Sequence, residues 1–360
     1  MTEGAGETRL ILPRIRWGWL LVALATLLFF YSARAILGPF LAGFVIAYLL
    51  DPVTNRLERR GVPRWLATTL VLSAFLAVIA GLVVATAPVI EAQFSQLLAN
   101  LPTIIDSVRP WVDEWSRRTG TPVNAQAVPT ELLQRAIAWL TGAIGGIIAS
   151  GLAFFNIVSL VVVAPVVAFY LLRDWKTVTA RIAGWWPRRY DPTIRELLAQ
   201  SDEALSGFVR GQFFVCICLA ILYAIGWGLI GLDYFIVLAL LAGLLGFVPF
   251  VGPFFGVAMS VLVAVGQFGI DPTRIGLVLL VFAVVQVIEG SVLTPNLIGN
   301  RIGLHPVWVL FAIFAGGELM GVIGIFLAVP IAAVTGVVAR WLLTQYLGSR
   351  FYGSGAPPPP

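Results

Sequence analysis

Charged residues are scarce in this chain of 360 residues, where they make up only 11% of the sequence. A typical soluble domain has about 25%. The hydrophobic residues reach 59%, and the mean hydropathy is +0.94. A water-facing surface needs more charge than this sequence supplies, so the composition predicts an integral membrane protein of the all-α class. It also excludes most classes of soluble enzyme.

Several residue types on which enzymes and metal sites depend are nearly missing. The only lysine is Lys176, and no glycine-rich phosphate-binding motif precedes it, so an ATP-driven pump would need that part from another chain. The only histidine is His305, which excludes a zinc site built on two or more histidines. Cys216 and Cys218 lie in an apolar run, where on a helix they would point apart. We therefore expect no catalytic residue, no metal and no cofactor.

Long apolar runs take up most of the chain. Crossing about 30 Å of hydrocarbon takes about 20 helical residues. Eight blocks qualify as candidate spans, at residues 17–31, 35–50, 65–89, 147–172, 211–230, 234–268, 275–293 and 306–343. The block at 35–50 is short, whereas those at 234–268 and 306–343 are far too long for one straight span.

Basic residues are unevenly distributed among the segments that join these blocks. With the N-terminus in the cytoplasm and each block counted as one span, 17 of the 23 basic residues fall on the cytoplasmic side. Because basic residues favour that side of a membrane, we expect both termini in the cytoplasm and the chain in the cell (inner) membrane. The net charge of +5 then reflects topology and does not indicate nucleic-acid binding.

Two segments outside the blocks have patterns of their own. Between residues 90 and 140, apolar residues such as Ile90, Phe94 and Leu97 recur at helical spacing. This predicts a helical cap packed on itself, helices lying in the outer membrane interface, or a contact in a homo-oligomer. Residues 185–189 form an aromatic and basic cluster typical of an interfacial anchor.

The expected organisation follows from these patterns. It comprises a cytoplasmic tail (1–16), the first transmembrane helices (17–89), an extracytoplasmic amphipathic region (90–146), a transmembrane helix (147–172), a cytoplasmic amphipathic segment (173–210), a transmembrane core (211–343) and a cytoplasmic Gly/Pro-rich tail (344–360).

Helix-breaking residues interrupt both over-long blocks near their middles. In the first block they are Gly246, Pro249, Gly252 and Pro253; in the second they are Gly316, Gly317, Gly321 and Gly324, with Pro330 further on. Proline removes a backbone donor and glycine weakens a helix. Such interrupted segments in paired positions are typical of a transporter's binding site.

We therefore predict two broken helices or helical hairpins whose tips meet near the membrane midplane. The alternative is close helix packing through the G-x-x-x-G pairs Gly252–Gly256 and Gly317–Gly321. If each block is a re-entrant hairpin, the loops at Asp271 and Arg301 exchange sides of the membrane. Each of these loops carries one arginine, so charge does not decide between the two arrangements.

Two acidic residues stand inside the apolar C-terminal half. Glu289 has Gln286 one turn before it, and Glu318 follows the double glycine. Acids within spans are costly and usually face an interior or a pathway. The predicted binding residues are Glu289, Gln286, Glu318, Asn296 and Arg301. Alternatively, Arg301 pairs with an acid and serves only stability, and His305 caps the helix that begins at Pro306.

Several groups of residues can be compared with a known family. They are Gly38-Pro39, Asp51-Pro52, the run from Phe169 to Asp174, the run from Gly246 to Pro253, Gln286-x-x-Glu289 followed by Pro295, the run from Gly303 to Pro306, and the run from Gly316 to Pro330. Together, and in this order, they resemble the autoinducer-2 exporter family of prokaryotic membrane proteins. The resemblance covers roughly residues 35–343. It implies about eight transmembrane segments and a role in transport, with members described as exporters of autoinducer-2 or as sodium/proton antiporters.

Three functions remain open at this point. The first is a secondary transporter, permease or exporter of a small polar solute, such as autoinducer-2. The second is a sodium/proton antiporter, in which Glu289 and Glu318 bind Na⁺ or H⁺. The third is a membrane scaffold whose working part is the amphipathic outer segment. The expected partners are therefore the lipid bilayer, a small polar solute or these ions, and further copies of the chain.

Overall fold

The computed structural model describes residues 37–119, 159–185, 188–269, 271–299 and 304–348, together with the isolated positions Ala25, Ser32 and Tyr352. Every regular element in these ranges is a helix, which confirms the all-α class. The expected block at 17–31, the tail at 1–16, and the residues between 120 and 158 lie outside this part of the chain, as does Arg301.

The first two long helices differ from their predicted bounds. Helix α2 runs over Leu37–Arg59, past Pro52, so the short block at 35–50 is part of a helix of 23 residues. Helix α3 runs over Arg64–Thr119 and continues through Pro102. No break separates its apolar start from the amphipathic stretch that follows.

The amphipathic face of α3 packs into the main body of the protein. Leu97 and Ile104 are buried, and Ile90 and Phe94 pack against the same core cluster. For these residues the structure corrects the expectation of a separate cap or an interfacial helix. Their helical spacing forms the face by which α3 packs against α8 and α9. The sequence pattern shows that such an apolar face exists but not which element covers it.

The middle of the chain forms one bent element and one very long helix. A short π-helical segment, η2 (Ser159–Val163), leads into α6 (Ala164–Ala183). Helix α7 (Asp191–Ile230) has 40 residues, about 60 Å at 1.5 Å per residue. It is therefore much longer than a bilayer core, and its N-terminal half extends beyond one.

The C-terminal half consists of shorter pieces. They are α8 (Phe235–Leu245), α9 (Val251–Phe268), α10 (Pro272–Ile288), the π-helical segment η3 (Glu289–Leu293), α11 (Thr294–Leu297) and α12 (Pro306–Leu347). In the described residues, six helices are long and apolar enough to cross a membrane, whereas α8 is too short. The protein is thus polytopic.

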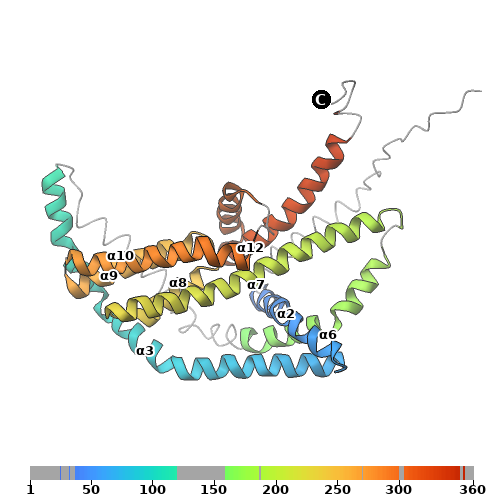
Figure 1. The fold of residues 1–360 in the computed structure, drawn as a ribbon, viewed down its shortest axis with the longest axis horizontal. Coiled ribbons are helices and arrows are strands. Elements are labelled where there is room, and N and C mark those ends of the chain that lie inside the picture. Colours follow the sequence, from blue (N-terminus) through green and yellow to red (C-terminus); the bar gives the residue numbers. More distant parts are fainter. Residues whose placement is uncertain are drawn as a thin grey trace, which may run out of the picture.

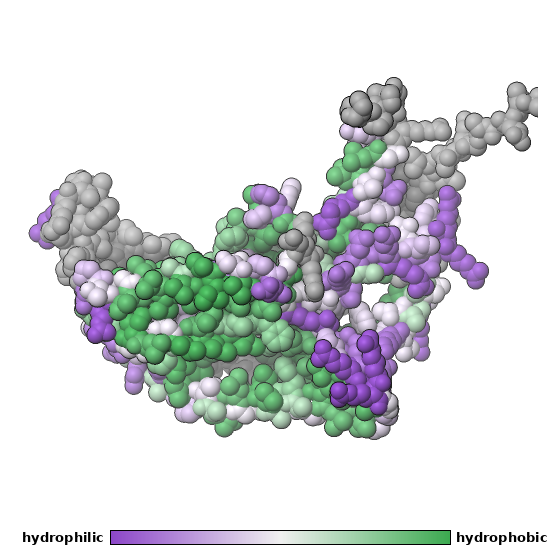
Figure 2. Space-filling model, viewed as in Figure 1, coloured by the Kyte–Doolittle hydropathy of each residue, from purple (hydrophilic) through white to green (hydrophobic). Residues whose placement is uncertain are grey.

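Helix α7 lies at the centre of the fold. Its buried residues Leu219, Tyr223 and Trp227 belong to the largest core cluster, which α8, α9 and α10 complete. Figure 1 shows α7, α8, α9 and α10 lying along one another, with α2 and α6 below the first half of α7. In Figure 2 a broad apolar face covers this group, and the polar residues gather at the opposite end of the molecule.

The loop between α9 and α10 lies at the same end as the loop after α7. The Arg274 guanidinium donates to the Ile230 carbonyl oxygen over 3.3 Å. The Gln267 amide donates to the Gly231 carbonyl oxygen over 2.9 Å. The block at 234–268 therefore enters and leaves at one end, and Arg274 moves to the side opposite the arginine-rich α2–α3 loop. This is the re-entrant alternative for this block and not the single span.

Candidate functional site

The first over-long block is a helical hairpin with its tip at residues 246–250. Helix α8 ends at Leu245 and α9 begins at Val251, so the predicted break is confirmed. Pro249 lies in the tip, and Pro253 lies in the first turn of α9, where a missing N–H costs nothing. A Cβ atom at Gly252 would lie 2.5 Å from Cα of Gly246, so the arms meet through bare backbone. Both predicted interpretations of this block therefore hold, since the break and the close glycine packing occur together.

One buried side chain supports this tip. The Gln212 amide of α7 donates to the Gly246 carbonyl oxygen over 2.5 Å, and Gln212 is 5% exposed. A carbonyl freed by a helix break needs such a partner away from water. We did not predict Gln212 from the sequence. A single amide at the start of the apolar stretch of α7 could have indicated a buried hydrogen-bonding role.

Replacing Gln212 with leucine should destabilise the first hairpin. The Gly246 carbonyl would lose its partner in a buried place, which costs about 1–3 kcal/mol. Thermal unfolding in detergent measures the loss. Gln200→Leu, at an exposed position on the same helix, is the matched control and should change little. Equal stability of the two variants would contradict this role of Gln212.

The second over-long block is also a hairpin. Helix α12 consists of two helical arms joined at Gly321, which has φ 62° and ψ −141°. The chain reverses direction at this residue. A Cβ atom at Gly316 would collide with the carbonyl group of Gly324, and one at Gly317 would press on Ile325. The predicted break is confirmed at Gly321, where a positive φ favours glycine. Gly316, Gly317 and Gly324 instead allow the two arms to touch.

The two hairpins meet. Phe247, at the first tip, packs on Phe326 of the second hairpin with ring centroids 5.3 Å apart. Val248 joins a buried cluster with Ile313 and Ala328, which belong to the two arms of α12. In Figure 1 the second arm of α12 points away from the end where α9 and α10 are joined. The hairpins therefore approach each other from opposite ends.

Glu289 lies near α7, the helix on which the first hairpin packs. It begins η3, a π-helical segment of the kind that often occurs at functional sites. Its Oε2 atom is buried and has no hydrogen-bond partner among the described residues. It is close enough to Cys216 and Tyr223 of α7 to interact electrostatically with both. Gly243 of the first hairpin lies against the Cys216 carbonyl, so this stretch of α7 packs on the hairpin and also interacts electrostatically with Glu289.

The other predicted binding residues are distributed unevenly. Gln286 shares this place, since its Oε1 accepts a hydrogen bond of 3.0 Å from the Tyr223 hydroxyl. Glu318 and Asn296 are exposed. Arg301 lies outside the described residues. The His305 imidazole accepts from the Val307 N–H, so the predicted cap at the start of α12 is confirmed.

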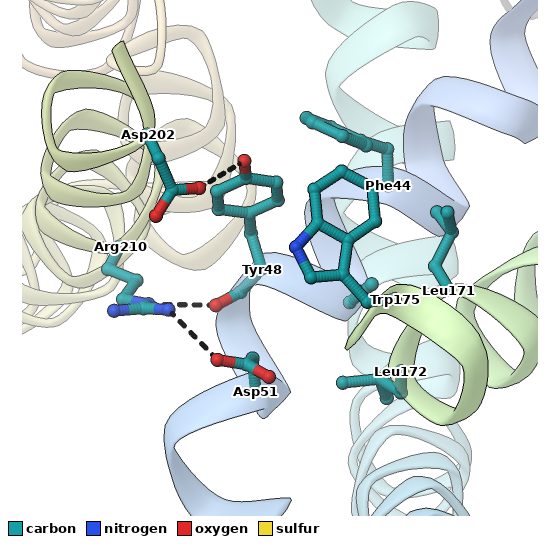
Figure 3. A pocket seen from close by; sticks show the side chains of 9 residues that line it. Phe44, Tyr48, Asp51, Leu171, Leu172, Trp175, Asp202 and Arg210 are labelled. Carbon is teal, nitrogen blue, oxygen red and sulfur yellow. Dashed lines mark hydrogen bonds and ion pairs between the residues drawn. The ribbon is translucent and has the colours of Figure 1, made fainter. Parts of the chain in front are cut away.

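A second polar cluster, which the sequence did not predict, lies at the arginine-rich end (Figure 3). The Tyr48 hydroxyl donates to Asp202 over 2.7 Å, and Arg210 donates to the Tyr48 carbonyl over 2.8 Å. These residues line a pocket of about 70 Å³ with Asp51 and Trp175. Tyr48 and Phe247 pack against the same buried cluster of Phe208, Val209 and Val329, which connects the pocket to the first hairpin.

Arg64 connects this cluster to α3. Its guanidinium bonds Asp51 at 3.1 Å, Glu58 at 2.7 Å and the Leu172 carbonyl at 2.8 Å. Lys176 of α6 bonds the same Glu58 at 2.7 Å. The Asp51-Pro52 motif thus marks an ion-pair junction of α2, α3, α6 and α7, a role that spacing along the chain does not reveal.

The fold and these contacts define a class. The protein is a polytopic membrane protein with two opposed helical hairpins and a partly buried acid near α7, features expected of membrane transporters. Residues 20–342 match the family model described as AI-2E family transporter. The chain belongs to this family, which supports a role in membrane transport.

Named relatives agree with this assignment. The chain is 27% identical over 317 residues to "Putative transport protein YrrI" of Bacillus subtilis, covering 86% of this chain and 87% of that protein. It is 27% identical over 330 residues to "Putative permease PerM" of Escherichia coli, covering 89% and 91%. Both relatives bear names from transport, and neither name specifies a substrate.

Proposed function

We propose that this protein is a secondary transporter that moves a small polar solute past the junction of its two hairpins. The observation that carries the proposal is the meeting of two broken helices from opposite ends, with Phe247 and Val248 of one packed on both arms of the other. A small rocking movement at such a junction would open the site to one end and then to the other.

Glu289 is the proposed coupling residue. Its carboxyl has a buried oxygen without a hydrogen bond among the described residues, which is costly when the group is ionised. It therefore suits a group that holds a proton in one state and a cation or solute in another. Gln286 and Tyr223 supply neutral polar atoms beside it.

The solute proposed from the family name is autoinducer-2 or a similar small polar molecule, moved outward. A sodium/proton antiporter is the second candidate, because the single buried carboxyl of Glu289 is enough to carry a proton. The scaffold hypothesis is weaker, since the face of α3 that it needs for partners is buried at Leu97 and Ile104.

Transport in proteoliposomes with defined ion gradients separates the two candidates. A solute transporter accumulates labelled autoinducer-2 under a proton or sodium gradient. An antiporter collapses a preset pH gradient when Na⁺ is added without any organic solute. Failure of both assays with correctly folded protein would remove the proposal.

Cysteine labelling should place the two ends on opposite sides of the cell membrane. With Cys216 and Cys218 replaced by alanine, Ser95→Cys and Thr273→Cys should label from outside, and Arg59→Cys only from the cytoplasm. Labelling of Thr273→Cys from the same side as Ser95→Cys tests the hairpin directly. One straight span over 234–268 would instead put Thr273 on the same side of the membrane as Arg59. Labelling of Ser95→Cys only from the cytoplasm would contradict the proposed cytoplasmic termini.

A further inference from the structure

An open groove of about 1030 Å³ lies between the second half of α6 and the first half of α7. The two helices converge toward the right in Figure 1, where α6 ends and α7 begins. Large apolar side chains line the groove and are open to the surroundings, with Trp175 at 38%, Ile182 at 39% and Leu198 at 49% exposure. Exposed apolar surface of this size in a charged region marks a place that another molecule covers.

Two basic residues, Lys176 and Arg195, line the same groove, together with the acidic Asp202, which accepts a hydrogen bond from Tyr48. Residues 173–195 contain six basic and two acidic side chains. Lys176 and Arg195 line the groove with side chains 63% and 60% exposed. Lys176 is paired with Glu58 and Arg195 with Asp191, and ammonium and guanidinium groups can each make more than one hydrogen bond. An occupant that combines an apolar body with a negatively charged group would therefore match both parts of the lining.

The location favours a lipid over a soluble molecule. The groove lies where α7 extends beyond the length of a bilayer core, next to Trp185, which is 81% exposed. Exposed tryptophan beside arginine is typical of the headgroup level of a membrane. Clusters of four to eight basic residues next to a transmembrane helix attract acidic lipids.

We propose that this groove binds one acidic phospholipid, with an acyl chain along Trp175, Ile182 and Leu198 and the phosphate between Lys176 and Arg195. The groove shares Tyr48 and Asp202 with the pocket of about 70 Å³ where α2 meets α7. A bound lipid would thus contact the α2–α7 junction and influence its opening, which goes beyond the proposed transport of a solute.

Native mass spectrometry of the full-length protein, titrated with phosphatidylglycerol or phosphatidylcholine, tests the charge requirement. We expect one saturable phosphatidylglycerol adduct, and binding about tenfold weaker in Lys176→Gln/Arg195→Gln. Arg188→Gln/Arg189→Gln removes the same charge outside the groove lining and should retain the adduct. Equal binding of both lipids, or equal loss in both double variants, would overturn the proposal.

A bulky residue tests the groove itself without a change of charge. Ala199→Trp fills the groove and should abolish the adduct, whereas Gln200→Trp, one residue away and outside the lining, should retain it. Thermal unfolding verifies that both variants are folded. Adduct formation in folded Ala199→Trp would overturn the proposal. So would a change in oligomer mass in place of lipid loss, which would assign the groove to a second copy of the chain.

Discussion

Glu289→Gln should fold normally and reduce transport by about a hundredfold, the scale on which a positioned proton carrier contributes. Glutamine keeps the shape and polarity of the side chain but cannot exchange a proton. Its amide can still lie beside Cys216 and Tyr223, so packing around η3 is preserved. Transport by the variant, if any remains, should no longer depend on pH. Uptake in proteoliposomes across a pH series measures both effects.

Glu318→Gln is the matched control. Glu318 is exposed, so the same chemical change should leave transport close to that of the native protein. An unstable Glu289→Gln, restored with transport intact by a paired change at Arg301, would show instead that Glu289 serves only a structural ion pair. If both glutamine variants lose transport equally, the loss follows from removing any one negative charge and not from the position of Glu289.

The glycines where the hairpin arms touch should be intolerant of a single methyl group. Gly252→Ala places a Cβ within 2.5 Å of the Gly246 backbone, and Gly324→Ala drives one into the Gly316 carbonyl. Since backbone cannot move aside as a flexible side chain does, the arms must separate. Overpacking of this kind costs about 1–3 kcal/mol or more. Lower melting temperatures and lower yields of folded protein are expected for both variants.

Gly276→Ala is the control for this pair. Nothing lies within 4 Å of a Cβ at Gly276, and alanine favours the helix, so the melting temperature should stay equal or rise. Native-like stability of Gly252→Ala together with Gly324→Ala would mean that the hairpin arms are not in contact through these glycines.

Much of the architecture could be predicted from helix breakers and length. The blocks at 234–268 and 306–343 exceed one span, and their glycines and prolines locate both breaks to within a few residues. The side of the membrane on which Arg274 lies could not be predicted. If a block is a hairpin and not a single span, the loop that follows it lies on the opposite side. A fold contact, from Arg274 to the Ile230 carbonyl, supplies that information.

The candidate site was harder to read from the sequence than the fold. Glu289 and Gln286 could be selected because acids and amides are rare within spans, and these two lie together. Glu318 satisfies the same rule yet is exposed, since composition does not show which face of a helix meets a neighbour. The Tyr48, Asp202 and Arg210 cluster joins residues more than 150 positions apart, a contact that only the folded chain brings about.

The short length of α8 bears on the order in which the protein is made. Its 11 residues span about 16 Å, too little to cross a bilayer on their own. Its tip carbonyl is bonded by Gln212 of α7, and Phe247 packs on Phe208 of the same helix, so both contacts can form before α12 is made. The buried cluster around Val248, in contrast, consists of residues from the two arms of α12. A chain that stops before α12 would therefore keep the support of the tip by α7 but lack the packing around Val248.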